Sequence, residues 1–200
     1  MSRMERRAVL ASAGLFVLAP RSALAAGKTR VVITTRLGAI TIELENQKAP
    51  LTCANFLRYV DAAKYDGGRF FRAARRPGAP TQGTIVASPN VRAQPFPPVA
   101  HESTTKTGLR HRDGAVSLGR FSPGTGRGDF FICVGAQPYL DARPGAPGDN
   151  LGFAVFGQVV NGMSVVRRIL AAPTSQESEF KEQRGQWLKP PIPIVSARRA

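Results

Sequence analysis

One arginine in an aromatic-rich run is the residue of this sequence best suited to act on a substrate. Residues 69–72 read RFFR after the turn-forming pair Gly67-Gly68, and Gln82, a long-armed amide, follows Arg72 by ten residues. Arginine is always charged and offers five N–H donors in a planar fork, which suits donation to a polar substrate group. The competing interpretation of Arg72 is a surface cation whose aliphatic stem covers the neighbouring rings.

The cysteines and histidines do not have the spacing of a metal site. Cys53 and Cys133 are far apart and belong to no C-x-x-C pair, and His101 and His111 lie in polar, loop-like sequence. We therefore expect no metal and no cofactor. Both cysteines lie inside apolar runs, which favours buried free thiols. A disulfide between them remains an alternative if the protein is exported, because an oxidising compartment permits it.

The composition is that of one globular domain, with 42% hydrophobic and 20% charged residues in a chain of 200. Sixteen prolines and 20 glycines imply many turns and exclude a mainly helical bundle. The net charge of +15 attracts polyanions and anionic lipid head groups, so polyanion binding in the cell envelope is one interpretation. The spacing of known nucleic-acid motifs is absent from the sequence, and we expect no specific nucleic-acid partner.

Residues 1–25 have the pattern of a signal peptide. Three arginines at positions 3, 6 and 7 precede a 12-residue apolar run at 8–19, Pro20 breaks that run, and Ala23-Leu24-Ala25 is a small-residue cleavage site. This run is too short to cross a hydrocarbon core of about 30 Å as a helix, so we expect no membrane span. Residues 26–200 would form the mature domain in the periplasm, with a net charge of +12 once four arginines and one glutamate are removed.

Two export routes fit this segment. The sequence ERRAVL at 5–10 resembles a twin-arginine signal, and a weakly hydrophobic core followed by Arg21 suits that route. General secretion is the alternative.

The mature chain alternates short strands and turns and contains two amphipathic helices. Ile40, Ile42 and Leu44 alternate with polar residues, which predicts a strand with one solvated face. Pro50 predicts a helix start, because the first helical turn needs no N–H there. We expect strands at 28–35, 39–45, 69–72, 83–88, 114–118, 130–134, 153–159 and 191–196, helices at 50–63 and 161–171, and loops at 75–80, 89–107, 121–129, 143–150 and 173–190.

Hairpin-linked strands without βαβ alternation favour a mainly β fold, a closed eight-stranded antiparallel barrel capped by two helices. The interior of such a barrel has room only for side chains. Any site must therefore lie on the outer face, among strand ends and long loops. The connection at 89–107 contains four prolines, and a connection of that length is usually functional or held down by contacts.

Five stretches, in order, resemble the cyclophilin family of peptidyl-prolyl cis-trans isomerases. They are TRLGAI at 35–40, APLTCANF at 49–56, GGRFFR at 67–72 with QG at 82–83, GAVSL at 114–118, and FFIC at 130–133 with FAVFGQV at 153–159. The resemblance covers nearly the whole mature chain and implies the same barrel. The long loop at 143–152 is similar to that of the exported bacterial branch.

The resemblance implies that Arg72 is the catalytic arginine and that Gln82 holds it. Rotation about an X–Pro bond must break C–N resonance over a barrier of about 20 kcal/mol. An arginine that donates to the imide nitrogen binds the twisted state more strongly than either planar state, which is the condition for catalysis. No nucleophile or cofactor is required.

The resemblance also implies an apolar pocket for the proline ring. Phe131 would form its floor, Leu140 and Phe153 would line it, and Tyr139 would stand where many relatives have tryptophan. The other substrate contacts that it implies are Phe71, Pro80, Gly119, Arg120 and Asp129, of which Gly119 and Arg120 would form a rim that pairs with the substrate backbone.

Several residues depart from the family pattern. Ala79-Pro80 replaces a Phe-Met pair, two extra residues precede it, and Phe71 stands where histidine is common. Asp129 replaces the usual glutamine and would weaken substrate binding if it paired with Arg72. Tyr139 lacks an indole N–H, so we expect only weak cyclosporin binding.

The sequence thus predicts a periplasmic prolyl isomerase that acts on proline-containing unfolded or newly exported chains. The alternative is a module on the same fold that binds proline peptides as a chaperone with little or no catalysis.

Overall fold

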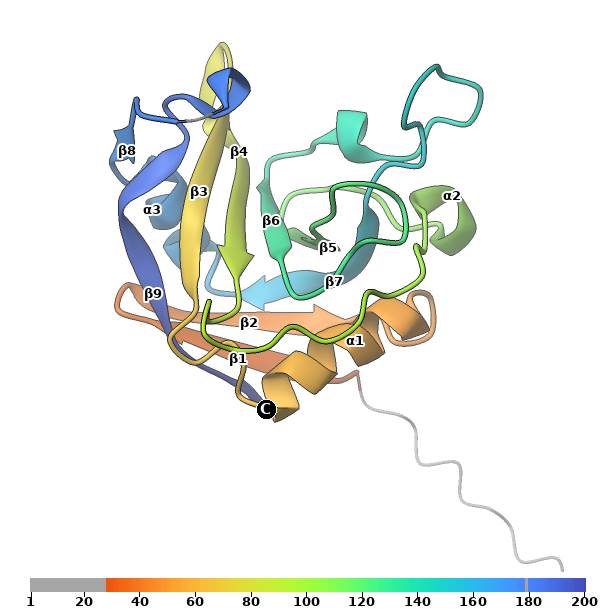
Figure 1. Cartoon of the computed structure of the whole chain (residues 1–200), viewed down its shortest axis with the longest axis horizontal. Helices are drawn as coiled ribbons and strands as arrows, with labels where there is room; N and C mark the ends of the chain where they lie inside the picture. Colours follow the sequence, from red (N-terminus) through yellow and green to blue (C-terminus); the bar gives the residue numbers. More distant parts are fainter. Residues whose placement is uncertain (1–27, 179) are drawn as a thin grey trace, which may run out of the picture.

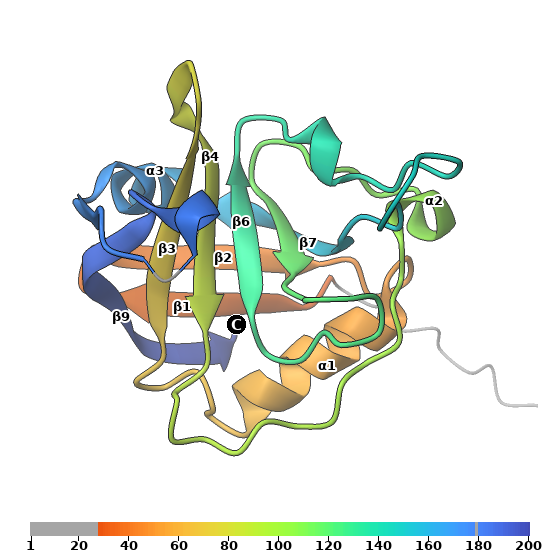
Figure 2. The ribbon, with the colours of Figure 1, turned by 45° about the horizontal axis from the view of Figure 1, so that its top comes forward.

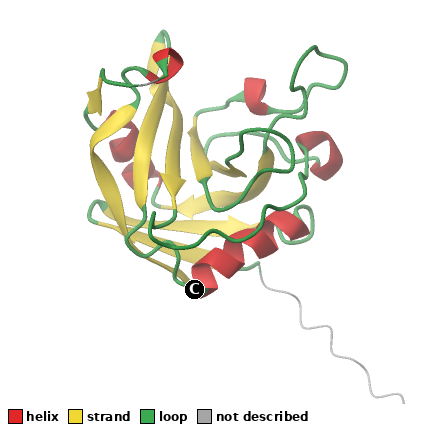
Figure 3. Ribbon diagram, viewed as in Figure 1, coloured by secondary structure: helices red, strands yellow, loops and turns green. Residues whose placement is uncertain are grey.

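A computed structural model describes residues 28–178 and 180–200, and antiparallel strands make up most of it (Figure 1; Figure 3). The expected signal peptide, residues 1–25, lies outside the described residues. The strands are β1 (Arg30–Thr35), β2 (Gly38–Leu44), β3 (Arg69–Arg76), β4 (Ala79–Ser88), β5 (Ala115–Leu118), β6 (Phe130–Val134), β7 (Ala154–Asn161), β8 (Thr174–Ser175) and β9 (Trp187–Arg199). The helices are α1 (Pro50–Asp61), α2 (Thr104–Thr107) and α3 (Met163–Ala171), with 3₁₀ turns η1 (Pro138–Leu140) and η2 (Lys181–Gln183).

The sheet closes on itself. Hydrogen-bonded neighbours follow the order β1-β2-β7-β5-β6-β4-β3-β9, and β1 also pairs with β9, so the two edges meet. The pairings are antiparallel throughout, and the two-residue β8 pairs with the start of β9. The predicted closed eight-stranded antiparallel barrel is confirmed for the described part of the chain.

Apolar residues of alternating strand positions fill the barrel. Ile33 of β1 and Ile40 of β2 are fully buried, and α1 and α3 add Phe56 and Ile169 to the same core cluster. The two long helices therefore cover the barrel core from different sides, with α1 below and α3 at the left in Figure 2. Within the described ranges, no helix is long and apolar enough to cross a membrane.

The expected loop at 75–80 is wrong. β3 and β4 continue through these residues as one hairpin that projects beyond the barrel (Figure 2). Pro77-Gly78 forms its turn, and Gly78 has a φ of 75°. Proline followed by a glycine with positive φ is the preference of a type II turn, so the loop signal marked a tight reversal and not an irregular segment.

Two other segments contain more structure than expected. The segment 173–190 contains β8, η2 and the first residues of β9, which begins at Trp187 and not at 191. The connection 89–107 contains the four-residue helix α2. Trp187 pairs with Arg72 of β3, more than a hundred residues earlier in the chain. The composition of a short segment cannot predict a strand partner at that distance.

The long connection 89–107 is held against α1 by a buried carboxylate. Ala49 precedes α1 and supplies no side-chain cap. Glu102, only 3% exposed, accepts hydrogen bonds from Leu51 N at 3.2 Å, Thr52 N at 2.8 Å and Thr52 Oγ1 at 2.7 Å. An anion at a helix N-terminus satisfies free N–H groups and complements the helix dipole. The connection is thus fixed by the helix that it crosses.

We predict that Glu102→Gln lowers the free energy of unfolding by about 2 kcal/mol, because an amide cannot accept all three hydrogen bonds and buried donors lose their partner. Urea unfolding followed by circular dichroism measures this change. Glu177→Gln is the control, since the Glu177 side chain is 87% exposed and a surface change should stay within about 0.5 kcal/mol. Equal stability of the two variants would contradict the prediction.

Candidate active site

Three neighbouring strands place an arginine and an aromatic ring on one outer face of the barrel. Arg72 of β3 pairs with Val86 of β4, and Val86 pairs with Phe131 of β6. Residues paired directly across strands lie on the same face of a sheet. Two strand spacings therefore separate the backbones of Arg72 and Phe131, about 10 Å.

A β-bulge turns Arg72 to this face. Phe70 and Ala73 are both fully buried in the barrel, a spacing of three that regular alternation cannot produce. The β3–β4 register passes from Phe70–Ala87 to Arg72–Val86 and skips Phe71. The extra residue reverses the alternation, so Phe71 and Arg72 both lie outside the barrel and are half-buried.

Gln186, and not Gln82, contacts the guanidinium of Arg72. Arg72 Nε and Nη2 donate to Gln186 Oε1 at 2.8 and 2.6 Å. Gln82 precedes Val86 by four residues, about 13 Å along β4, and its side chain lies beside Gly135. Among the described residues, the hydrogen bonds from Arg72 to Gln186 thus take the place of the contact that the resemblance implies between Gln82 and Arg72. Burial lowers the pKa of Arg72 from its ordinary value.

A second apolar cluster, the outer cluster, surrounds Phe131 outside the barrel. The Phe153 ring stands edge-on to Phe131 with centroids 5.2 Å apart. Three of the predicted pocket residues, Phe131, Leu140 and Phe153, thus come together here. The outer cluster consists of buried Ala115, Phe131, Cys133 and Val155 with the partly buried Val86, Leu109, Leu140 and Phe153.

A buried polar group supports the outer cluster from behind. The His111 ring stacks on Phe131 with centroids 5.8 Å apart. Its Nδ1 lies 2.7 Å from Asp141 Oδ1, and its Nε2 lies 3.1 Å from Ser117 Oγ. Ser, His and Asp in this order resemble a nucleophilic triad, but Ser117 is fully buried and no substrate can reach it. Sequence reasoning assigned His111 to a loop and missed this contact.

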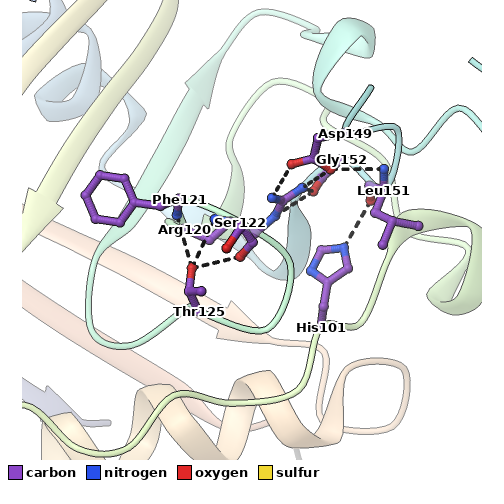
Figure 4. Close-up of polar contacts among 8 residues, drawn as sticks. All are labelled: His101, Arg120, Phe121, Ser122, Thr125, Asp149, Leu151 and Gly152. Carbon is purple, nitrogen blue, oxygen red and sulfur yellow. Dashed lines mark hydrogen bonds and ion pairs between the residues drawn. The ribbon is translucent and has the colours of Figure 1, made fainter. Parts of the chain in front are cut away.

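Arg120 fixes the loop before β7, as Figure 4 shows. Its guanidinium donates to both carboxylate oxygens of Asp149 at 2.5 and 2.9 Å and, through Nε, to Gly152 O at 2.9 Å. These hydrogen bonds lower the pKa of Asp149. The Arg120 side chain is only 4% exposed, so it holds the loop and is not free for a ligand. Its neighbour Gly119 donates its N–H to Asp129 O at 2.7 Å.

The other predicted contact residues lie around this face. Asp129 is exposed, and Arg72 donates to Gln186 with no ion pair to Asp129 among the described contacts. Tyr139 is 54% exposed on η1, next to Leu140. Phe71 packs against Trp187 with ring centroids 5.4 Å apart. Pro80 is exposed near the tip of the β3–β4 hairpin, away from the outer cluster.

Both cysteines are free and buried. Cys53 belongs to the barrel core and Cys133 to the outer cluster, so they lie on opposite faces of the sheet. Burial raises the pKa of each thiol to about 12, which leaves both uncharged at neutral pH. Among the residues that the structure describes, no three His, Cys, Asp or Glu side chains are grouped to hold a metal ion.

The fold and this face define a barrel that presents an arginine beside an external apolar surface. Residues 30–199 match the model of the family described as cyclophilin type peptidyl-prolyl cis-trans isomerase/CLD. Peptidyl-prolyl cis-trans isomerase A of Dickeya dadantii is 33% identical over 99% of this chain and 98% of its own length. A peptidyl-prolyl cis-trans isomerase of Acinetobacter baylyi is 32% identical over 98% and 96%, respectively. The chain belongs to the cyclophilin-type peptidyl-prolyl cis-trans isomerases, as the resemblance predicted.

Solved structures agree on the fold. A cyclophilin type isomerase of Cryptosporidium parvum superposes with a TM-score of 0.64 at 18% identity, covering 86% of this chain and 98% of that one. The same protein solved in the presence of the dipeptide Ala-Pro gives a TM-score of 0.63 at 19% identity.

We predict that protonation of His111 destabilises the fold. Burial lowers the pKa of His111 below the ordinary value of 6.5 despite the opposing effect of Asp141. Between the folded and unfolded pKa values the unfolded chain binds more protons, so stability present above about pH 6.5 is lost as the pH falls toward the folded pKa. His111→Asn removes this proton linkage.

Urea unfolding at about pH 7.5 and about pH 5.5 measures the effect. The decrease in unfolding free energy should be smaller for His111→Asn than for the wild type, whereas His101→Asn, a change in the exposed loop contact to Leu151 O, should keep the wild-type decrease. An identical pH dependence in all three proteins would show that His111 carries no proton linkage.

Proposed function

We propose that Arg72 and the outer cluster together catalyse cis-trans isomerisation of X–Pro bonds, with the proline ring on the apolar side chains around Phe131. The observation that carries this proposal is the row Arg72–Val86–Phe131 on one outer face. A charged donor and an apolar seat share one face two strands apart, so both can approach the same proline ring, whose nitrogen is the imide nitrogen. Isomerisation makes and cuts no covalent bond, so these two elements are the ones that the chemistry needs.

The apolar surface holds the ring while the preceding carbonyl rotates. Phe131 is 6% exposed, and Val86, Leu140 and Phe153 are partly exposed beside it. Arg72 donates to the imide nitrogen, whose lone pair becomes available only when C–N resonance is lost. This hydrogen bond exists in the twisted state and in neither planar state, so it lowers the barrier instead of tightening ground-state binding. Partial burial strengthens it, because the surroundings screen less than water does.

The rim of the site supplies backbone groups. Gly119 has already used its N–H on Asp129 O, so its carbonyl is the group left to pair with a substrate N–H. The Arg120 side chain serves Asp149 and Gly152. Arg120 therefore contributes to substrate binding by keeping the loop before Phe153 in place. Phe71, Tyr139 and Asp129 border the same face and would contact residues that flank the proline.

The alternative, a proline-peptide binding module with little catalysis, rested on Asp129 and on Ala79-Pro80. Arg72 hydrogen-bonds the neutral amide of Gln186 and keeps its charge for a ligand. Ala79 and Pro80 belong to the projecting hairpin and take no part in the outer cluster. Both points favour catalysis.

The chain also acts, in this proposal, on unfolded and newly exported proline-containing polypeptides in the periplasm. The signal-peptide pattern of residues 1–25 supports this location. The absence of an indole at Tyr139 supports weak cyclosporin binding. The twin-arginine pattern at 5–10 favours that route over general secretion.

Arg72→Ala should lower kcat/KM for a proline peptide by about 100-fold, because a donor that acts only in the twisted state is lost. NMR exchange between cis and trans signals of the peptide, with residues 26–200, measures it. Arg69→Ala is the matched control, an exposed arginine three residues earlier on β3, and should keep wild-type turnover. If Arg72→Ala gave the same cis-trans exchange rate as the wild type, the mechanism would be refuted. If the wild type bound the peptide without cis-trans exchange, the binding module would be favoured.

Expression of the full chain in a Gram-negative host tests the location. We expect the protein in the periplasmic fraction with Ala26 as its first residue, and Arg6→Lys with Arg7→Lys should block export if the twin-arginine route is used. Export that continues in the double variant would assign general secretion. An uncleaved cytoplasmic protein would refute the proposed location.

A further inference from the structure

Arg72 is held by a segment of the chain that follows α3 and precedes most of β9. Gln186 Oε1 accepts from both Nε and Nη2 of Arg72, at 2.8 and 2.6 Å. These two N–H groups form one edge of the guanidinium fork. One acceptor that bridges this edge fixes the plane of the fork, and it leaves Nη1 and the second N–H of Nη2 for other partners.

Gln186 is itself fixed on both sides. Its Nε2 donates to Glu182 O at 2.8 Å, which sets the amide so that Oε1 points to Arg72. Its backbone carbonyl accepts from Ala73 N at 2.7 Å. The next residue, Trp187, pairs with Arg72 in the β3–β9 register and packs on the Phe71 ring. Backbone, amide and aromatic contacts thus bind residues 182–187 to the bulged part of β3.

The bulge makes this contact possible. It carries Arg72 to the outer face, where the β9 side of β3 borders residues 182–187. Gln82 lies on the other side, at the hairpin end of β4. A neutral amide also suits the position, because a carboxylate there would form an ion pair and reduce what Arg72 offers to a ligand.

We propose that Gln186 is the positioning residue for Arg72. The inference rests on the proposed catalytic role of Arg72. Gln186 touches no reacting atom in this scheme. It holds the fork so that the free N–H groups point over the outer face, which spares orientation entropy in the twisted state. Loss of Gln186 should therefore lower turnover and leave ground-state peptide binding nearly unchanged.

The test compares Gln186→Leu with Gln183→Leu, a glutamine of η2 three residues earlier whose side chain makes no hydrogen bond to Arg72 in the described structure. For Gln186→Leu we expect kcat/KM for a proline peptide to fall about tenfold and the peptide Kd to change less than about twofold. The Arg72 Nε–H signal in ¹H–¹⁵N NMR should lose its protection from exchange with water. Gln183→Leu should match the wild type in all three measurements. Gln186→Glu keeps an acceptor oxygen and should restore the Nε–H protection, but its turnover should stay below that of the wild type because the carboxylate forms an ion pair with Arg72.

A double variant separates positioning from a general structural effect. Adding Gln186→Leu to Arg72→Lys should cause no further loss of turnover, because lysine has no fork to orient. A further tenfold loss in that background overturns the inference, and so does wild-type turnover in Gln186→Leu. Those results leave the proposed function intact as long as Arg72→Ala is impaired. If Arg72→Ala has full activity, the catalytic role of Arg72 fails first and the inference fails with it.

Discussion

The pairing of β1 with β9 closes the sheet, and this closure decides where a ligand can meet the protein. Eight strands enclose only enough space for side chains. Aromatic rings occupy part of that space, and the Phe56 ring centroid lies 5.6 Å from that of Phe130 and 5.1 Å from that of Phe156. A peptide cannot enter such a core. A peptide must therefore bind on the outer face. A strand residue is exposed there only if its side chain points out of the barrel, which every second residue of a regular strand does.

The bulge at Phe71 lets β3 bury two residues three positions apart and still turn Arg72 outward, which a regular strand cannot do. Phe70 and Ala73 fill the barrel, and Arg72 must still face outward. One unpaired residue resolves the conflict at the cost of an interrupted ladder. β3 also pairs with β9 on both sides of the bulge, and Trp187, the partner of Arg72, directly follows Gln186, so the arginine is exposed and held at the same point of β3.

Two buried or nearly buried charges keep the long loops in place. Glu102 ties the connection 89–107 to the start of α1, and Arg120 ties the loop before β7 to the rim of the outer cluster. In both cases a charged group satisfies several backbone or side-chain partners at once, which offsets its desolvation. Loops with little regular structure are thereby made rigid enough to border a site.

The contacts of His111 and Gln186 show where sequence reasoning ended. His111 meets Asp141 across 30 residues, and Gln186 meets Arg72 across 114. Neither contact has a local signal, since histidine in a polar stretch and glutamine before a proline-rich strand are ordinary surface residues by composition. Hydrogen bonds between such distant positions depend on register and bulge geometry, which no short window of sequence contains.

The sequence by itself predicted the barrel and the two long helices, and its resemblance to a family placed Arg72, Phe131, Leu140 and Phe153 at one site. Apolar alternation and turn residues act over a few positions, and the family motifs lie on these elements. Only the tertiary structure decided that Gln186 and not Gln82 contacts Arg72, that residues 75–80 continue a hairpin, and that Arg120 serves a loop. These outcomes follow from strand register and from the bulge, because a shift of one residue changes which side chains share a face.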